Sequence, residues 1–279
     1  MSYKNTQSIC LNMIVKNESH IIEKTLTKLV EYFKFSYWVI SDTGSTDNTI
    51  QIIETFFKNK NIPGEIVEEE WKDFGYNRTF ALEKAYNKSD YLLIFDADDS
   101  IEGKLDLPKQ LTKDMYLLKF GPGVYYWRPL LVSNRVNWCF KGVVHEFLSL
   151  KQPRHTSSEN LDGNYHVVSG RIGNRNKQGN KYLKDAEMIV KALGTEKDQG
   201  MINRYWFYAG QSYKDAKKFD EAIPYYLKVI EGQCWNQEQY YSCFMIGNIY
   251  KDQKNDEMNA IKYFLMSDKF DPERIEGLT

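Results

Sequence analysis

Three aspartates stand within four positions of the chain, at Asp96, Asp98 and Asp99. Carboxylates this close repel one another unless a cation, a proton or hydrogen-bond donors compensate their charge. Oxygen ligands without a Cys or His nearby in the run indicate Mg²⁺ or Mn²⁺ rather than zinc. A solvated acidic turn is the alternative that these residues alone leave open.

The apolar run from Tyr91 to Phe95 directly precedes these aspartates. An unbroken apolar run of this length predicts a strand buried on both faces of a parallel sheet. The carboxyl end of that strand would then present the aspartates at the edge where open α/β sheets bind ligands.

The elements before this strand alternate between strand and helix. We expect strands at 9–15, 37–41 and 65–68, and helices at 22–33, 50–57 and 79–86. Alternation of this kind is typical of a parallel α/β sheet. Polar residues follow three of the predicted strands, at 16–18, 42–44 and 96–99, and should meet at one edge of the sheet.

Capping residues are expected at two of these helices. Ser19 is placed to cap the first helix, and Ser45 or Thr46 the second. Gly44 allows the tight turn between the second strand and its helix.

The sequence changes character after Ser100. Strands are expected at 115–120 and 125–132 around a Gly-Pro-Gly turn, followed by a single extended run at 138–148. The polar, Gly-rich stretch from 151 to 180 is predicted to be a loop.

The residues from 201 onward are helical and repetitive. Small and aromatic residues with the spacing of a tetratricopeptide unit occur twice, at Trp206, Gly210, Tyr213, Ala222 and Tyr226, and again at Gly247, Tyr250, Ala260, Phe264 and Pro272. An amphipathic helix at 181–193 could cap one end of the array. Because such arrays need about three units or a cap, the stop at Thr279 leads us to expect a truncated chain or a homodimer interface. We therefore predict two domains, at 1–180 and 181–279.

Composition excludes several classes of partner. The net charge is −1, and no basic cluster indicates nucleic-acid binding. The four cysteines form no C-x-x-C pair, and neither a signal peptide nor a transmembrane segment is visible. These features predict a cytoplasmic protein without a membrane span.

Residues 9 to about 150 resemble the family 2 glycosyltransferases of GT-A fold. The resemblance rests on M-I-V-K-N-E at 13–18, S-D-T-G-S-T-D-N-T at 41–49 and D-A-D-D at 96–99, each at a predicted strand end. Two further stretches, W-K-D-F-G-Y-N-R at 71–78 and G-V-V-H-E at 142–146, look like motifs of the branch that carries tetratricopeptide repeats. The resemblance implies a Rossmann-like GT-A domain followed by an all-α repeat domain.

The resemblance also implies which residues bind the donor, a uridine nucleotide-sugar. The residues that would contact its base, ribose or diphosphate are Asn17, Glu18, Asp42, Asn77, Arg78 and Asp96. The metal, Mn²⁺ or Mg²⁺, would be bound directly by Asp98, with Asp96 reaching its water shell. A divalent cation held there neutralises the charge on the departing nucleoside diphosphate.

Glu146 is the expected catalytic base of an inverting transfer, because the acceptor must be deprotonated as it attacks. Asp99 is the second candidate for that role. His145 would complete the metal shell or hydrogen-bond the diphosphate, with His166 as its rival. The alternative is that Glu146 pairs with an arginine and His145 only packs.

Three functions therefore compete. The first is a metal-dependent glycosyltransferase that moves a sugar from a UDP-sugar to a peptide, protein or glycan acceptor. The second is a non-catalytic adaptor that uses its repeats to bind a partner and carries an inactive transferase domain. A sugar-nucleotide pyrophosphorylase is disfavoured because Lys16–His20 contains no glycine for a phosphate loop.

Overall fold

The computed structural model describes residues 7–177 and 179–274. These residues form two compact units. The first unit covers 7–142 and 146–177, and the second covers 143–145 and 179–274. No helix among the described residues is both long and apolar enough to cross a membrane.

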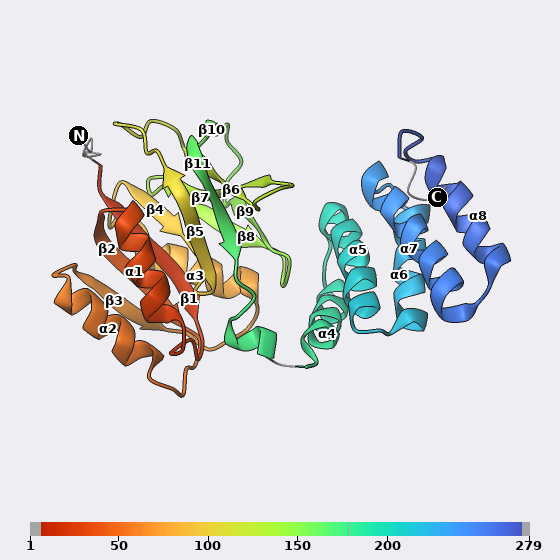
Figure 1. The fold of residues 1–279 in the computed structure, drawn as a ribbon, viewed down its shortest axis with the longest axis horizontal. Coiled ribbons are helices and arrows are strands. Elements are labelled where there is room, and N and C mark those ends of the chain that lie inside the picture. Colours follow the sequence, from red (N-terminus) through yellow and green to blue (C-terminus); the bar gives the residue numbers. More distant parts are fainter. Residues whose placement is uncertain (1–6, 178, 275–279) are drawn as a thin grey trace. The chain divides into compact units, whose positions relative to one another are not determined.

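Four parallel strands form one half of the main sheet (Figure 1). Their order is β3-β2-β1-β4, and they are β1 (Ile9–Val15), β2 (Phe35–Asp42), β3 (Gly64–Glu68) and β4 (Tyr91–Ile94). The prediction of a parallel α/β arrangement is confirmed for this half. Because β2 and β4 flank β1 on opposite sides, the strand order reverses at β1, where α/β sheets bind ligands.

The other half of the sheet is mixed and includes strands that the sequence did not predict. It continues as β7-β6-β11-β5, and β10 pairs with β6. The bounds of these strands are β5 (Asp99–Leu105), β6 (Met115–Phe120), β7 (Tyr126–Ser133), β10 (Ser158–Asn160) and β11 (Gly163–Ser169). The prediction of a continuous loop at 151–180 is therefore wrong, since β10, β11 and the 3₁₀ helix η1 (Asn174–Lys177) lie within it.

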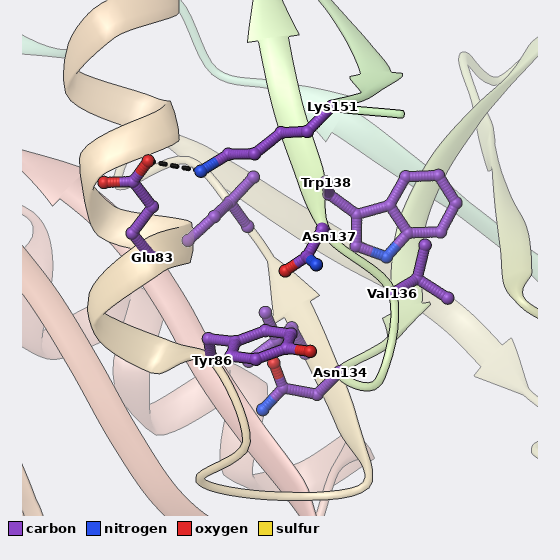
Figure 2. Close-up of a pocket in the computed structure, with 9 residues that line it drawn as sticks. Glu83, Tyr86, Asn134, Val136, Asn137, Trp138 and Lys151 are labelled. Atoms are coloured by element: carbon purple, nitrogen blue, oxygen red, sulfur yellow. Dashed lines mark hydrogen bonds and ion pairs between the residues drawn. The ribbon is translucent and has the colours of Figure 1, made fainter. Parts of the chain in front are cut away.

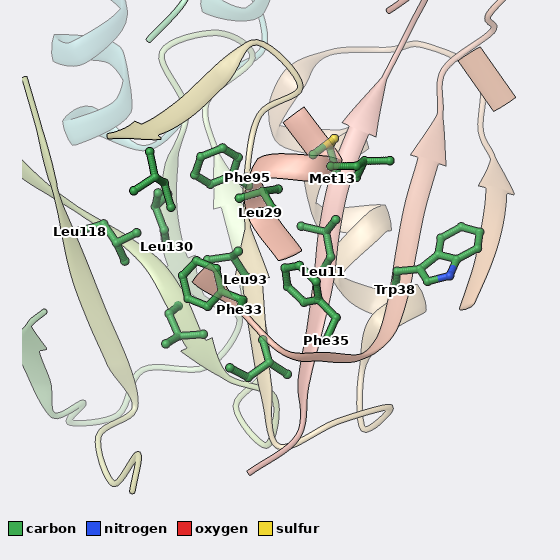
Figure 3. Packing of buried hydrophobic residues seen from close by; sticks show 14 of the residues in the cluster. Leu11, Met13, Leu29, Phe33, Phe35, Trp38, Leu93, Phe95, Leu118 and Leu130 are labelled. Carbon is green, nitrogen blue, oxygen red and sulfur yellow. The ribbon is translucent and has the colours of Figure 1, made fainter. Parts of the chain in front are cut away.

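Helices cover the two faces of the sheet. On one face, α1 (Ile22–Tyr32) and α2 (Thr49–Asn59) pack over alternate residues of β1 in the larger core cluster, part of which Figure 3 shows. On the other face, α3 (Phe74–Ala85) contributes Leu82 and Ala85 to a second cluster with Leu92 and Trp138. Successive side chains of a strand point to opposite faces of the sheet, so the same strands contribute residues to both clusters.

Three local predictions in this unit are wrong. The N-cap position of α1 is occupied by Ile21 instead of Ser19, and that of α2 by Asn48 instead of Ser45 or Thr46. Helix α3 starts at Phe74 instead of 79, because the Asp73 carboxylate caps it by accepting a hydrogen bond from Tyr76 N at 2.7 Å. The run at 138–148 is a hairpin of β8 (Trp138–Lys141) and β9 (Phe147–Leu150).

The second unit consists of paired helices, which confirms the predicted all-α repeat region. Helices α5 (Gln199–Asp215) and α6 (Phe219–Glu231) pack together, as do α7 (Asn236–Lys254) and α8 (Glu257–Asp268), while α4 (Lys181–Leu193) packs on α5. The ring of Tyr226 lies against Gly210, and that of Phe264 against Gly247. A Cβ at these glycines would stand 2.8 and 2.4 Å from those rings, so only glycine permits the close approach.

Candidate functional site

The three predicted polar segments follow β1, β2 and β4, which are neighbouring parallel strands. The turns after β1 and β2 are bonded to each other. Asn17 N donates to Ser45 Oγ at 2.9 Å, and Thr46 N donates to Asn17 Oδ1 at 2.7 Å. Asn17 has a φ of 56°, a left-handed conformation that asparagine tolerates better than most residues. The carboxyl edge of the sheet thus brings these segments together.

Asp42 ends β2 and is only 3% exposed. Its Oδ2 accepts hydrogen bonds from Gly44 N at 3.0 Å and Ser45 N at 2.7 Å, which fix the carboxylate in place. Its Oδ1 is buried and has no hydrogen-bond partner in the described part of the chain. An unsatisfied buried acceptor is costly, so this oxygen is suited to a ligand that brings a donor.

Arg78 on α3 joins two acidic residues from distant parts of the sequence. Its Nη2 lies 2.6 Å from Asp96 Oδ1, and its Nε lies 2.7 Å from Glu146 Oε1. The Arg78 side chain is 10% exposed, so water screens these contacts weakly. Burial acts to raise the pKa of Asp96, but the charges of Arg78 and Arg128 outweigh it and hold that pKa below its usual value.

Asp99 is the first residue of β5 and is buried. Burial, reinforced by the charges of Asp96 and Asp98, raises the pKa of Asp99 to about 7. A carboxyl group with such a pKa carries a proton about half the time near neutral pH. The three aspartates therefore hold more negative charge than their surroundings compensate.

The segment after β11 lies over the carboxylates of Asp98 and Glu18. Gly173 N donates to Asp98 Oδ2 at 3.2 Å, and Asn174 N donates to Glu18 Oε1 at 3.1 Å. Burial raises the pKa of Glu18, the bond from Asn174 lowers it, and the charge of Asp98 raises it further. The carboxylates of Glu18 and Asp98 thus lie close together at the edge of the sheet. Gly173 can pack against both of them because it has no side chain.

The aspartates suit a hard divalent cation. Within the described residues, no three His, Cys, Asp or Glu side chains are arranged as a complete metal site. Mg²⁺ and ions like it are commonly bound by one or two carboxylates together with substrate phosphates, rather than by a cage of protein ligands. The excess charge that raises the pKa of Asp99 is the kind that such a cation relieves.

The remaining predicted residues have other partners. Asn77 is buried, with Oδ1 accepting from Lys72 N at 2.9 Å and Nδ2 donating to Glu70 O at 3.1 Å, so its amide fixes the turn before α3. His145 belongs to the second unit, where its ring stacks on Tyr208 at 4.1 Å between centroids. His166 Nε2 lies 3.5 Å from Glu102 Oε2. A metal role for His145 stays a prediction.

Arg128 is a member of the site that the sequence did not reveal. Its positive charge acts to lower the pKa of both Asp96 and Asp99. Together with Arg78, Phe140 and Glu146, it lines a cavity of about 180 Å³. Its position in the predicted strand at 125–132 was visible in the sequence, but the pairing of β7 beside β4 that brings it to Asp96 was not.

Two family models match the chain. Residues 10–114 match the model described as glycosyl transferase family 2, and residues 204–231 match a tetratricopeptide repeat. No curated protein matches the chain.

Several solved structures are similar in fold. TarS of S. aureus, residues 1–349 in complex with UDP-GlcNAc, is 14% identical over 94% of this chain and 91% of that chain, with a TM-score of 0.48. The mannosyltransferase PcManGT from Pyrobaculum calidifontis, in complex with GDP-Man and Mn²⁺, is 12% identical over 98% and 90%, with a TM-score of 0.42.

Proposed function

We propose that this chain is a glycosyltransferase that moves a sugar from a UDP-sugar to an acceptor by a metal-dependent, inverting reaction. The matches to the glycosyl transferase family 2 model over residues 10–114 and to a tetratricopeptide repeat over residues 204–231 support this proposal. The observation that carries this proposal is the position of Asp42, Asp96 and Asp98 at the carboxyl ends of β2 and β4, which flank β1. This is where α/β sheets of this order bind nucleotides.

Asp42 is suited to the uracil ring. The imide N–H of uracil is a donor, and it would satisfy the buried Oδ1 of Asp42 that has no other partner in the described residues. The turn at Asn17, bonded to Ser45 and Thr46, would hold the same end of the nucleotide. Asp96, fixed by Arg78, is the candidate contact to the ribose.

Asp98 and Asp96 would hold the cation, Mn²⁺ or Mg²⁺. When bound, such an ion neutralises the charge that develops on the departing diphosphate. The chain's own contribution is to keep these carboxylates ionised and fixed, which Arg78 does for Asp96.

A panel of UDP-, GDP-, dTDP- and CMP-sugars tests this proposal, with slow hydrolysis of the donor as the readout and no acceptor present. We expect one UDP-sugar to be hydrolysed with Mn²⁺ and none to be hydrolysed in EDTA. A preference for another nucleotide would show that the donor is misassigned, and no hydrolysis at all would favour the non-catalytic adaptor.

We propose Glu146 as the base that deprotonates the acceptor. It lines the same cavity as Asp96 and Asp99, and Arg78 Nε, 2.7 Å from Glu146 Oε1, holds its carboxylate in place. Glu146→Gln should lower transfer to the acceptor about 100-fold or more while donor and metal affinity stay unchanged.

Asp99 is the alternative base, because its pKa of about 7 lies near the working pH of most enzymes. Comparing Glu146→Gln with Asp99→Asn in the same transfer assay separates the two. If Glu146→Gln instead weakens donor binding and keeps its rate per bound donor, Glu146 contacts the donor and Asp99 is the base.

The helical unit is proposed to form a homodimer. The exposed face of α8 carries Met258, Ile261 and Leu265 at helical spacing, an apolar stripe of the kind that marks an interface. Light scattering should give the mass of a dimer for the wild type and of a monomer for Ile261→Lys. A wild-type monomer at high concentration would argue against this interface.

A further inference from the structure

Three cavities of the first unit follow one another along the seam between α3 and β8. The cavity with Arg78 and Glu146 shares Phe140 with a cavity of about 310 Å³ lined by Tyr76, Thr79 and Phe80. That second cavity shares Glu83 with a third of about 240 Å³, which lies beside Tyr86 and Trp138 (Figure 2). The series begins at the candidate site and ends near the carboxyl end of α3.

The residues of α3 that line this seam occupy one side of the helix. Tyr76, Phe80 and Glu83 are spaced by four and three residues, which places them on a common stripe. From Gly75 to Tyr86 the stripe extends roughly 16 Å at 1.5 Å per residue. Three cavities that share lining residues over this length suit a chain molecule better than a single small one.

Asn134, which lines the third cavity, has a polar atom with no hydrogen-bond partner among the described residues. Asn134 is 1% exposed, and its Nδ2 donates to Ala85 O at 2.8 Å. Its Oδ1 is buried and accepts no hydrogen bond from any described residue. Figure 2 shows Asn134 next to Tyr86, with the oxygen on the Tyr86 side of the amide. A hydroxyl donor entering this cavity would satisfy the oxygen.

The charges that line the second and third cavities cancel. Glu83 is the charged residue that lines both cavities, and Lys151 lines the third. Their carboxylate and ammonium groups lie 2.5 Å apart, as the dashed line in Figure 2 marks. The other lining side chains are aromatic, aliphatic, amide, hydroxyl or thiol groups. A neutral occupant with apolar faces and many hydroxyl groups matches this lining.

An extended peptide is disfavoured because the edge of β8 toward α3 is already bonded. Phe140 N donates to Thr79 Oγ1 at 2.8 Å, and Trp138 N donates to Val136 O at 3.0 Å. Peptides that bind along a strand need such groups free. Sugar rings need none, since they stack on aromatic side chains and bond through their hydroxyls.

We propose that the acceptor is a neutral glycan chain lying along the seam between α3 and β8. This inference rests on the proposed glycosyl transfer. The accepting sugar lies in the cavity with Glu146, and the following units lie against Tyr76 and Phe80, and then against Tyr86, where a hydroxyl bonds Asn134 Oδ1. The enzyme therefore extends or decorates an oligosaccharide rather than a single sugar.

An array of neutral oligosaccharides of one to six units, beside an array of unglycosylated peptides, tests the proposal with the full chain. We expect the wild type to bind at least one oligosaccharide series, with affinity that rises up to three or more units. Tyr86→Ala and Phe80→Ala should each weaken binding of the longer members about tenfold, since each removes one stacking contact. Binding of a single sugar should not change.

The matched control is Tyr125→Ala, which removes an exposed tyrosine in the β6–β7 turn, away from these linings. It should bind as the wild type does. Binding only to peptides, no binding to any oligosaccharide, or binding that Tyr86→Ala and Phe80→Ala leave unchanged would overturn the proposal. Donor hydrolysis without acceptor distinguishes failure of the proposed transferase function from failure of the proposed glycan site. Its absence in the wild type would contradict the transferase function. Normal hydrolysis without glycan binding would contradict only the glycan site between α3 and β8.

Discussion

Arg78→Met should lower the free energy of unfolding by about 3–5 kcal/mol. The guanidinium is buried and bonded to both Asp96 and Glu146. Removing it leaves two carboxylates in a poorly hydrated site without the guanidinium that both contact, and Asp99 adds to the repulsion. Urea denaturation measures the loss, and donor hydrolysis should be abolished in the same variant.

The matched control is Arg135→Met. The Arg135 side chain is 78% exposed and pairs with Asp90 at 2.9 Å, so water screens the interaction. Its loss should change stability by no more than about 1 kcal/mol. Adding Glu146→Gln to Arg78→Met should recover part of the lost stability, because one unpaired charge is removed. Equal, small effects of the two arginine variants would show that the Arg78 contacts do not organise the site.

Asp98→Asn should reduce metal-dependent hydrolysis of the donor about 1,000-fold or more. An ion that loses its main protein ligand no longer stabilises the leaving group, an effect of several kcal/mol. The fold should be retained, because asparagine keeps one oxygen to accept the bond that Gly173 N now gives to Asp98 Oδ2. The thermal midpoint should stay within a few degrees of the wild type.

Asp106→Asn provides the control, since the Asp106 side chain is exposed and its Oδ1 lies 3.6 Å from Lys104 Nζ, away from the three aspartates of the site. It should keep full activity. Near-normal turnover with Mn²⁺ in Asp98→Asn would remove Asp98 from the metal site.

The parallel half of the sheet was predictable because its strands are short apolar runs that each end in polar residues. The same pattern predicts that Asp42 and the three aspartates lie at one edge of the sheet. Strands β5 and β11 were not predicted, because each mixes a glycine and several polar residues with its apolar ones, and the two are held by pairing with each other. Pairing partners separated by some 60 residues in the chain leave no local signal in either strand.

The catalytic side of the site was harder to predict for the same reason. The sequence indicated Arg78, Asp96 and Glu146 singly, but one guanidinium joins carboxylates 18 and 68 residues away. The neighbours His145 and Glu146 were expected to act together. In the structure His145 has a φ of 53°, its ring stacks on Tyr208, and Glu146 pairs with Arg78.

Calorimetric titration with UDP, in Mn²⁺ and then in EDTA, tests the central claim most directly. We expect saturable binding of one UDP per chain in Mn²⁺, strongly weakened in EDTA and in Asp98→Asn. Binding that is absent in both buffers, or equal in both, would contradict a metal-dependent UDP-sugar transferase.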